Sequence, residues 1–373
     1  MTPSSSAFKS VFVALICLSL ISPSAFAGGP PAQGKIPLSG SARVKIAAFG
    51  RIQVDSGGAK DVIAYRWVGT PASLAYKSAG AWRILSVARS SSAPMPGELR
   101  ITLPSSIAHV YVGSDQGTIV VRGLNATLEA VTLAGDIDVR DVRGTVTART
   151  GGGEMTFAAI GGALRSFSDG GSIRVESALA EANLQTAGGE IFVGRVRGPL
   201  RATTSGNIQV REAESTVAVH TSGGLIEILR ASGAVTAENG GGSIVVGSAP
   251  SVHAESAGGG IRLKSISGPA RATTSTGPLV AAFTRNATLA TSFLSAGSGD
   301  LTVYLPSNIS VTVKALNEST GWRGGIKSEF PDLRLKRPAS GFGAAYAEQS
   351  LNGGNSLLML SVSSGSISVK RAR

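Results

Sequence analysis

Glycine and apolar residues recur at fixed intervals through the middle of the chain. One clear unit begins at Gly135, continues with aliphatic residues at alternating positions, such as Ile137 and Val139, and ends where Gly153 opens the next unit. The glycines that share this phase are Gly117, Gly135, Gly153, Gly171, Gly189, Gly206, Gly224, Gly242, Gly259 and Gly277. Their spacing is 18 residues, with two intervals of 17. Internal periodicity of this length indicates a repeat architecture.

Each unit predicts two short β-strands separated by tight corners. Apolar residues at alternating positions place one face of a strand inward. The first strand follows the phased glycine, and a further glycine, such as Gly144 or Gly233, often precedes the second strand. Glycine is expected there because a corner needs a positive φ or a close approach of two backbones. Neither strand can bury its apolar face within one unit, so we expect the units to stack about 4.8 Å apart.

These stacked units predict an all-β fold, a single-stranded parallel β-helix or β-solenoid with about 18 residues per coil. A left-handed hexapeptide β-helix would need an aliphatic residue at every sixth position. The inward offsets here are 2, 4, 7, 11, 13 and 15 residues after the glycine, so a right-handed or flattened coil is favoured, right-handed first. The flanking sequences are less regular, and we expect irregular β caps at both ends that cover the terminal edge strands.

A column of small polar residues ends the second strand of each unit. Its members are Thr132, Thr150, Ser168, Thr186, Thr204, Thr221, Asn239, Ser256 and Thr274. Each side chain can form hydrogen bonds, and we expect each to bond to its equivalents in the coils above and below. We interpret the column as structural, because buried polar groups at a turn need such partners.

The first residues of the chain predict an export signal. Lys9 precedes an apolar run that is too short to span a bilayer, and residues 25–27 form the small-x-small pattern that signal peptidase cleaves. Cys17 is the only cysteine and lies in this segment, so the mature protein would contain no disulfide and no thiolate ligand. We expect export through a cleaved signal peptide to the periplasm, the extracellular space or the cell surface, with no transmembrane segment after cleavage.

The pattern divides the chain into five segments, and charge follows the same division. The segments are a signal peptide (1–27), a linker (28–40), an N-terminal β region or cap (41–116), the regular solenoid core (117–282) and a C-terminal solenoid continuation and cap (283–373). The core carries 14 basic and 14 acidic residues, whereas residues 28–116 carry 10 against 4 and residues 283–373 carry 10 against 5. A neutral rod poor in Trp and Tyr predicts no nucleic-acid partner. The basic ends favour anionic polysaccharide or lipid head groups, or form an ordinary solvated surface.

Few residues in the sequence suit catalysis or metal binding. The three histidines are His109, His220 and His253, and no two of them have the HxxxH spacing of a helical zinc site. No serine has glycine two residues before and two residues after it, so a nucleophile elbow is excluded. We therefore predict no cofactor and no metal site.

One acidic group is an alternative to this conclusion. Asp136 and Asp138 are expected on the same outer face, and Glu154 lies one coil along at the offset of Asp136. Two carboxylates about 5 Å apart can act as nucleophile and acid in glycoside cleavage. Every coil is limited to 17 or 18 residues, however, so no long loop builds the concave pocket that a substrate needs. We therefore predict that the protein is not an enzyme. Asp136, Asp138 and Glu154 are the candidate catalytic residues of the enzymatic alternative.

The sequence resembles a family of bacterial proteins across roughly residues 41–373. The segments that carry the resemblance are 99–104, 110–114, 117–121, 299–306 and 365–369, together with the serial Gly-x-Ile-x-Val coils. They are similar to the DUF4097 family of candidate adhesins and, in part, to the head-domain autotransporter-adhesin group. The resemblance implies a single-stranded β-helix with an adhesive role and no established catalytic residues.

The sequence therefore predicts an exported, non-enzymatic β-solenoid. We expect an adhesin or an envelope module that binds surfaces or proteins, with envelope polysaccharide, an anionic surface or other proteins as partners. Two alternatives stay open. One is a polysaccharide-cleaving enzyme on a parallel β-helix, and the other is a purely structural envelope scaffold.

Overall fold

The computed structural model describes residues 32–38, 43–69, 73–88, 97–319, 325–331, 333, 335–336, 344–354 and 356–372. The predicted signal peptide, with Cys17 and the cleavage pattern at residues 25–27, lies outside these residues, so export stays a prediction. Within the described residues no helix is present that could span a membrane.

The described residues fold into two long sheets of β-strands. Sheet A contains, in spatial order, β1 (Gln33–Pro37), β4 (Val62–Val68), β7 (Glu98–Leu103), β3 (Arg51–Ser56), β9 (Ile119–Arg122), β11 (Ile137–Val142), β13 (Met155–Ile160), β15 (Ile173–Ala178), β17 (Ile191–Val196), β19 (Ile208–Ala213), β21 (Ile226–Ala231), β23 (Ile244–Ala249), β25 (Ile261–Ile266), β27 (Leu279–Phe283), β29 (Leu301–Leu305), β35 (Ile367–Arg371) and β31 (Ile326–Ser328).

Sheet B faces sheet A and contains the other strand of each coil. Its spatial order is β5 (Ser73–Ala79), β6 (Trp82–Ala88), β2 (Arg43–Ala48), β8 (His109–Ser114), β10 (Thr127–Thr132), β12 (Val146–Thr150), β14 (Leu164–Ser168), β16 (Ala182–Thr186), β18 (Leu200–Thr204), β20 (Val217–Thr221), β22 (Val235–Asn239), β24 (Val252–Ser256), β26 (Ala270–Thr276), β28 (Ser292–Ser298), β34 (Leu357–Ser364), β30 (Val311–Asn317), β33 (Ala345–Leu351) and β32 (Leu335–Lys336).

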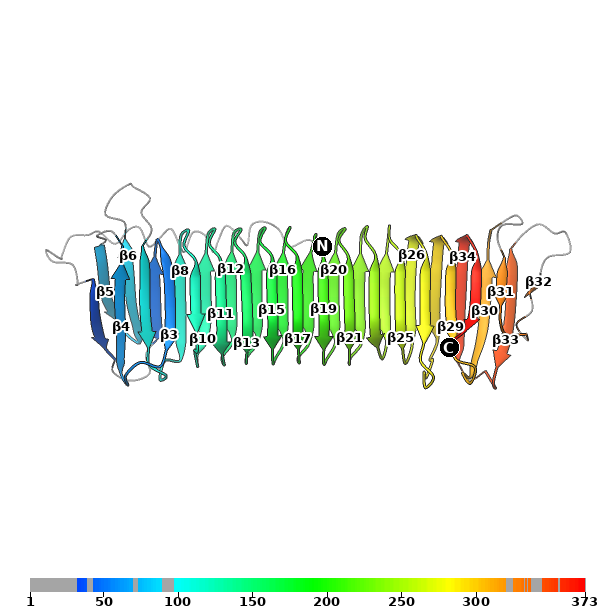
Figure 1. The fold of residues 1–373 in the computed structure, drawn as a ribbon, viewed down its shortest axis with the longest axis horizontal. Coiled ribbons are helices and arrows are strands. Elements are labelled where there is room, and N and C mark those ends of the chain that lie inside the picture. The colour runs from blue at the N-terminus through cyan, green and yellow to red at the C-terminus, as the bar shows by residue number, and fades with distance from the viewer. Residues whose placement is uncertain are drawn as a thin grey trace.

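Successive coils stack in parallel to form a straight rod (Figure 1). Ile137 pairs with Met155 and Met155 pairs with Ile173, so residues 18 apart are neighbours in sheet A. Leu128, Val146 and Leu164 show the same register in sheet B. The predicted all-β solenoid with two strands per coil is therefore confirmed, and its handedness stays a prediction.

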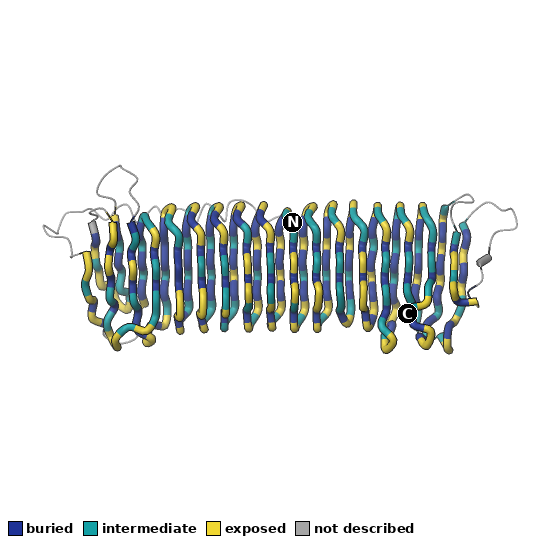
Figure 2. Tube along the Cα trace, in the orientation of Figure 1, coloured by how far each residue is buried: buried dark blue, intermediate teal, exposed yellow. Residues whose placement is uncertain are grey.

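The core is a continuous apolar layer between the two sheets. On β17, Ile191 and Val193 are 1% and 0% exposed, whereas Phe192 between them lies on the outer surface. Figure 2 shows the same alternation in every coil, with exposed residues concentrated at the corners. Full burial of one such aliphatic side chain stabilises the fold by about 1.5–3 kcal/mol. The rod is therefore stabilised by this repeated inward face, without any disulfide.

Close approach of two backbones explains why glycine is needed at the start of each coil. A Cβ on Gly153 would overlap the carbonyl oxygen of Gly135 in the preceding coil. A Cβ on the neighbouring Gly152 would meet nothing within 4 Å. Neither residue has a positive φ, so the requirement at Gly153 is space and not an unusual backbone conformation.

The polar column lies inside the rod, but its hydrogen bonds differ from the prediction. The Thr150 hydroxyl donates to the Gly135 carbonyl oxygen at 2.9 Å and accepts from the Gly153 N–H at 3.1 Å. Thr186 repeats both bonds with the phased glycines of its own coils. The partners are glycine backbone groups and not equivalent side chains, because the hydroxyl lies directly beside the corner where two glycines meet. The structural interpretation of the column is confirmed, and its predicted side-chain ladder is wrong.

We expect Thr150→Val to lower the free energy of unfolding by about 1–3 kcal/mol, because it leaves a buried carbonyl and a buried N–H without partners. Thr147→Val is the matched control, since Thr147 lies on the outer face of the same strand. Urea denaturation monitored by circular dichroism measures both changes. Equal effects of the two substitutions would contradict the role assigned to the column.

At both ends of the rod the spatial order of the coils differs from their order in the sequence. Near the N-terminus the coil β2–β3 lies between β6–β7 and β8–β9. Near the C-terminus the last coil, β34–β35, lies between β28–β29 and β30–β31. In Figure 1 the red strands of the last coil therefore stand inside the orange ones. The coil nearest each end of the chain is held on both sides by coils from another segment, which protects it from fraying.

Antiparallel strands complete the two ends. At one end β4 pairs with β7, β5 pairs with β6 and β1 pairs with β4, all antiparallel. At the other end β33 pairs antiparallel with β30. Strand β1 lies within residues 28–40, the segment treated as a linker from the sequence, so residues 33–37 of that segment belong to the folded structure.

Deletion of residues 357–373 should loosen the C-terminal end while leaving the middle of the rod intact. In the intact protein the Gly299 and Leu301 N–H groups donate to Ser364 and Ser366 of the last coil, at 2.8 and 2.9 Å. We expect these two amides to lose protection from hydrogen exchange in the shortened protein. The Ile191 amide, which donates to Asn207 in the rod centre, serves as the internal control. Unchanged protection at Gly299 and Leu301 would contradict the interleaved topology.

Candidate functional site

The three predicted acidic residues, Asp136, Asp138 and Glu154, lie on the outer face of sheet A. The Glu154 N–H donates to Asp136 Oδ1 at 2.8 Å, so these two residues are direct neighbours in adjacent coils. Asp138 follows on β11, where Arg140 Nε donates to its two oxygens at 2.9 and 3.3 Å. The hydrogen bond to Asp138 and the charge of Asp138 raise the pKa of Arg140. The sequence therefore placed these carboxylates correctly relative to one another.

Two of these carboxylates are open to solvent, and the third is bound by an arginine. Asp136 and Glu154 are exposed, and the two oxygens of Asp138 share the Nε–H of Arg140. A shallow depression of about 660 Å³ does occur among the described residues, but at the C-terminal end of sheet B. It contains the ion pair of Lys314 and Glu348, at 3.0 Å. None of the carboxylates of the candidate group lines this depression.

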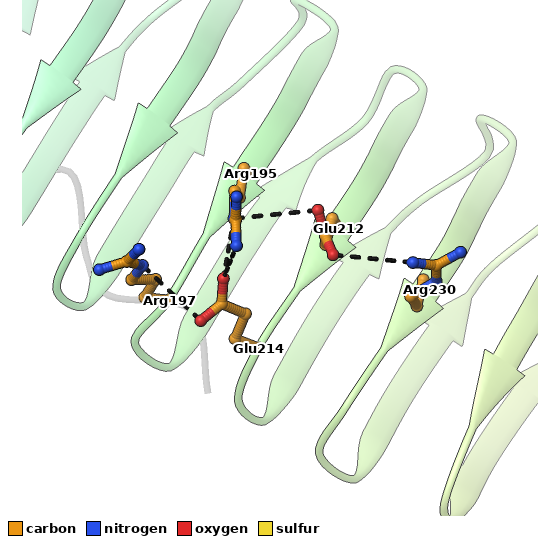
Figure 3. A network of polar contacts seen from close by, with 5 residues as sticks. All are labelled: Arg195, Arg197, Glu212, Glu214 and Arg230. Carbon is orange, nitrogen blue, oxygen red and sulfur yellow. Dashed lines mark hydrogen bonds and ion pairs between the residues drawn. The ribbon is translucent and has the colours of Figure 1, made fainter.

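A second charged group lies where the strands β17, β19 and β21 of sheet A end, and five residues of neighbouring coils form one network there (Figure 3). Arg195 Nε donates to Glu214 Oε1 at 2.8 Å and lies 3.8 Å from Glu212 Oε2, and Arg230 contacts the other oxygen of Glu212 at 3.8 Å. The pKa of Arg195 is raised, first by the hydrogen bond to Glu214 and then by the negative charges of Glu214 and Glu212. The three arginines exceed the two glutamates by one positive charge, and the five side chains are 33–69% exposed, so these ion pairs contribute little to stability.

The histidines on the rod are paired with glutamates on the outer face of sheet B. His220 Nδ1 lies 3.4 Å from Glu238 Oε2, and His253 Nε2 lies 3.1 Å from Glu255 Oε1. Both histidines lie at outward positions of their strands, between residues that are buried in the core. In the described part of the chain no group of three or more His, Cys, Asp or Glu side chains could hold a metal ion.

A cluster that sequence reasoning missed lies at the N-terminal end of sheet B. We call it the aromatic–basic face, and it consists of Arg43, Lys45, Trp82, His109 and Tyr111. The Arg43 guanidinium lies 5.8 Å from the centre of the Trp82 ring, and the Lys45 ammonium lies 4.9 Å from that of Tyr111. The rings of Trp82 and His109 meet edge to face at 5.6 Å. Burial, followed by the charge of Glu129, raises the pKa of Tyr111 to about 12.

The interleaved coil explains why the sequence does not reveal this cluster. Arg43 and Lys45 belong to β2, which pairs with β6 on one side and β8 on the other. Register then places Arg43 between Trp82 and His109, although these residues are far apart in sequence. Arg43 and Lys45 point outward because Val44 and Ile46, which alternate with them along β2, are buried in the core. The cluster could have been predicted only if the order of the strands at this end of the rod had been known.

Comparison with known proteins gives little further information. No protein-family model matches the sequence, and no curated protein matches it. A solved structure of a candidate cell adhesion protein from Clostridium sporogenes is similar at a TM-score of 0.19 and 10% sequence identity. The similarity covers 92% of this chain and 100% of that protein. It is too distant to indicate a shared function.

Proposed function

We propose that this protein is a non-enzymatic β-solenoid of the bacterial cell envelope that binds surfaces, in the manner of an adhesin. The observation that carries the proposal is the form of the molecule, a long rod with two flat, regular outer faces (Figure 1). Flat sheets suit contact with extended partners such as polysaccharides or other proteins, because they offer area without a closed pocket. No family model matches the chain, so the resemblance of its coils to DUF4097 proteins and its predicted signal peptide stay expectations from the sequence, and both agree with this proposal.

The local chemistry also favours binding over catalysis. The carboxylates proposed for glycoside cleavage are exposed or bound to Arg140, and the depression on the surface lies at the other end of the rod. Several charged side chains on the rod form ion pairs with side chains of neighbouring coils, as Arg195 and Arg165 do.

Binding to envelope material tests the proposal directly. Purified mature protein should be retained in a saturable manner by insoluble cell-envelope fractions, and fractionation of cells that express a tagged copy should place it outside the cytoplasm. Retention no greater than that of an unrelated protein of similar charge would contradict the binding function and favour the purely structural scaffold.

A glycan panel distinguishes the enzymatic alternative. We expect no release of reducing ends from acidic or neutral polysaccharides. Turnover that is abolished by Asp138→Asn, in a variant with an unchanged circular dichroism spectrum, would overturn the non-enzymatic assignment.

A further inference from the structure

The aromatic–basic face combines two cations with three polar rings on the outer surface, where Arg43 is exposed and the other four residues are half-buried. Its residues come from three adjacent strands, β6, β2 and β8, so the face spans about 10 Å across the sheet. Trp82, His109 and Tyr111 contribute apolar ring surface as well as one indole N–H, an imidazole and a phenol hydroxyl. Lys77 on β5 lies in register with Ile84 on β6 and adds a third cation at the rim.

No carboxylate of the described residues forms an ion pair with the two cations of this face. Among the described residues, neither Arg43 nor Lys45 forms an ion pair, and their near contacts are the aromatic rings. On the opposite face of the same end, by contrast, Glu98 bridges Arg51 and Arg100. The closest acidic neighbour along the strands is Glu129, which pairs in register with Tyr111. The aromatic–basic face therefore carries uncompensated positive charge.

The donor set indicates the chemistry of the ligand. A guanidinium binds a carboxylate in a bidentate manner, and neutral donors and acceptors beside it suit hydroxyl groups. Aromatic surface packs against the apolar C–H face of a sugar ring, because the ring faces are rigid and amphipathic. A nucleic acid carries a phosphate on every nucleotide and needs a longer basic track than three cations provide. A lipid surface offers few hydroxyl groups for the rings to contact.

We propose that the aromatic–basic face binds an acidic polysaccharide, with its carboxylates on Arg43 and Lys45 and its hydroxyl and C–H groups on the three rings. This inference rests on the proposed binding function and assigns it a site and a ligand class. The interleaved β2 strand is then part of the function, because it inserts the two cations between the rings that β6 and β8 present.

Alginate, a linear polymer of uronic acids, is the probe, and dextran is the neutral comparison. In affinity electrophoresis at physiological ionic strength we expect alginate to retard the mature protein and dextran to leave it unaffected. Arg43→Ala and Trp82→Ala should each raise the dissociation constant for alginate by about tenfold, since each removes a direct contact to the ligand. Lys45→Gln tests the charge with little change in shape, should Trp82→Ala disturb folding.

The far end of sheet B supplies matched controls. Arg271 lies 5.9 Å from the Phe293 ring, an arrangement similar to that of Arg43 and Trp82. Arg271→Ala and Phe293→Ala should leave alginate binding unchanged. Losses as large as those at the aromatic–basic face would overturn the site, as would equal or tighter binding of single-stranded DNA or phosphatidylglycerol vesicles.

The inference and the proposed function fail in different ways. Envelope retention by the wild-type protein, with alginate binding unaffected by Arg43→Ala and Lys45→Gln, would overturn the inferred site and leave the binding function intact. Absence of retention by envelope material and alginate alike would overturn both.

Discussion

Ile191→Asp should unfold a large part of the rod. The side chain is 1% exposed and packs in the apolar layer between the two sheets. A buried, unpaired carboxylate is among the most destabilising changes in a protein core, and we expect a loss of at least about 4 kcal/mol in the free energy of unfolding. Urea titration followed by circular dichroism and by limited proteolysis measures the effect.

Asn183→Asp is the control for this prediction. Asn183 lies on the outer face of β16 and pairs in register with Arg165 on one side and Arg201 on the other. The same carboxylate placed there meets solvent and two cations, so we expect a change close to zero. Similar destabilisation by the two substitutions would show that the assignment of inner and outer faces is wrong.

Gly153→Ala should destabilise the protein by about 3 kcal/mol, although it adds only one methyl group. The new Cβ would overlap the carbonyl oxygen of Gly135, and both belong to backbone segments held by the stack. The strain cannot be relieved by rotation of a side chain, so two coils must separate locally. Thermal and urea denaturation of the purified variant give the magnitude.

Gly152→Ala provides a control one residue away in the same corner. A Cβ at Gly152 has open space around it, and its backbone lies outside the left-handed region. We expect a stability equal to the wild type or slightly above it, because alanine restricts the unfolded chain. A Gly152→Ala variant as unstable as Gly153→Ala would indicate that backbone conformation, and not coil contact, selects glycine in this corner.

The repeat made the middle of the fold predictable from the sequence. Glycines in phase and inward residues such as Ile137 and Val139 recur with one register, so a single rule describes every coil of the core. The polar column was also recognised, because burial without partners is costly for a hydroxyl. Its true partners were missed, since they are backbone groups of glycines whose positions depend on the shape of the corner.

The ends of the rod were not predictable in the same way. Local patterns indicate that β2, β6 and β8 are strands, but they do not encode which strand lies beside which when the order departs from the sequence. The candidate acidic group was predictable because its members follow the regular register. The aromatic–basic face depends on the interleaved β2, and Arg43 and Trp82 become neighbours only in the folded structure.

The distance between spin labels along one outer column tests the stacked solenoid most directly. The only cysteine lies in the predicted signal peptide, so cysteines introduced into the mature chain can be labelled selectively. Labels at Thr147 paired with Thr236 and with Arg271 lie five and seven coils apart in sheet B. Parallel stacking predicts separations near 24 and 34 Å, about 4.8 Å for each coil. Two distances that do not grow in proportion to the number of coils would contradict the solenoid.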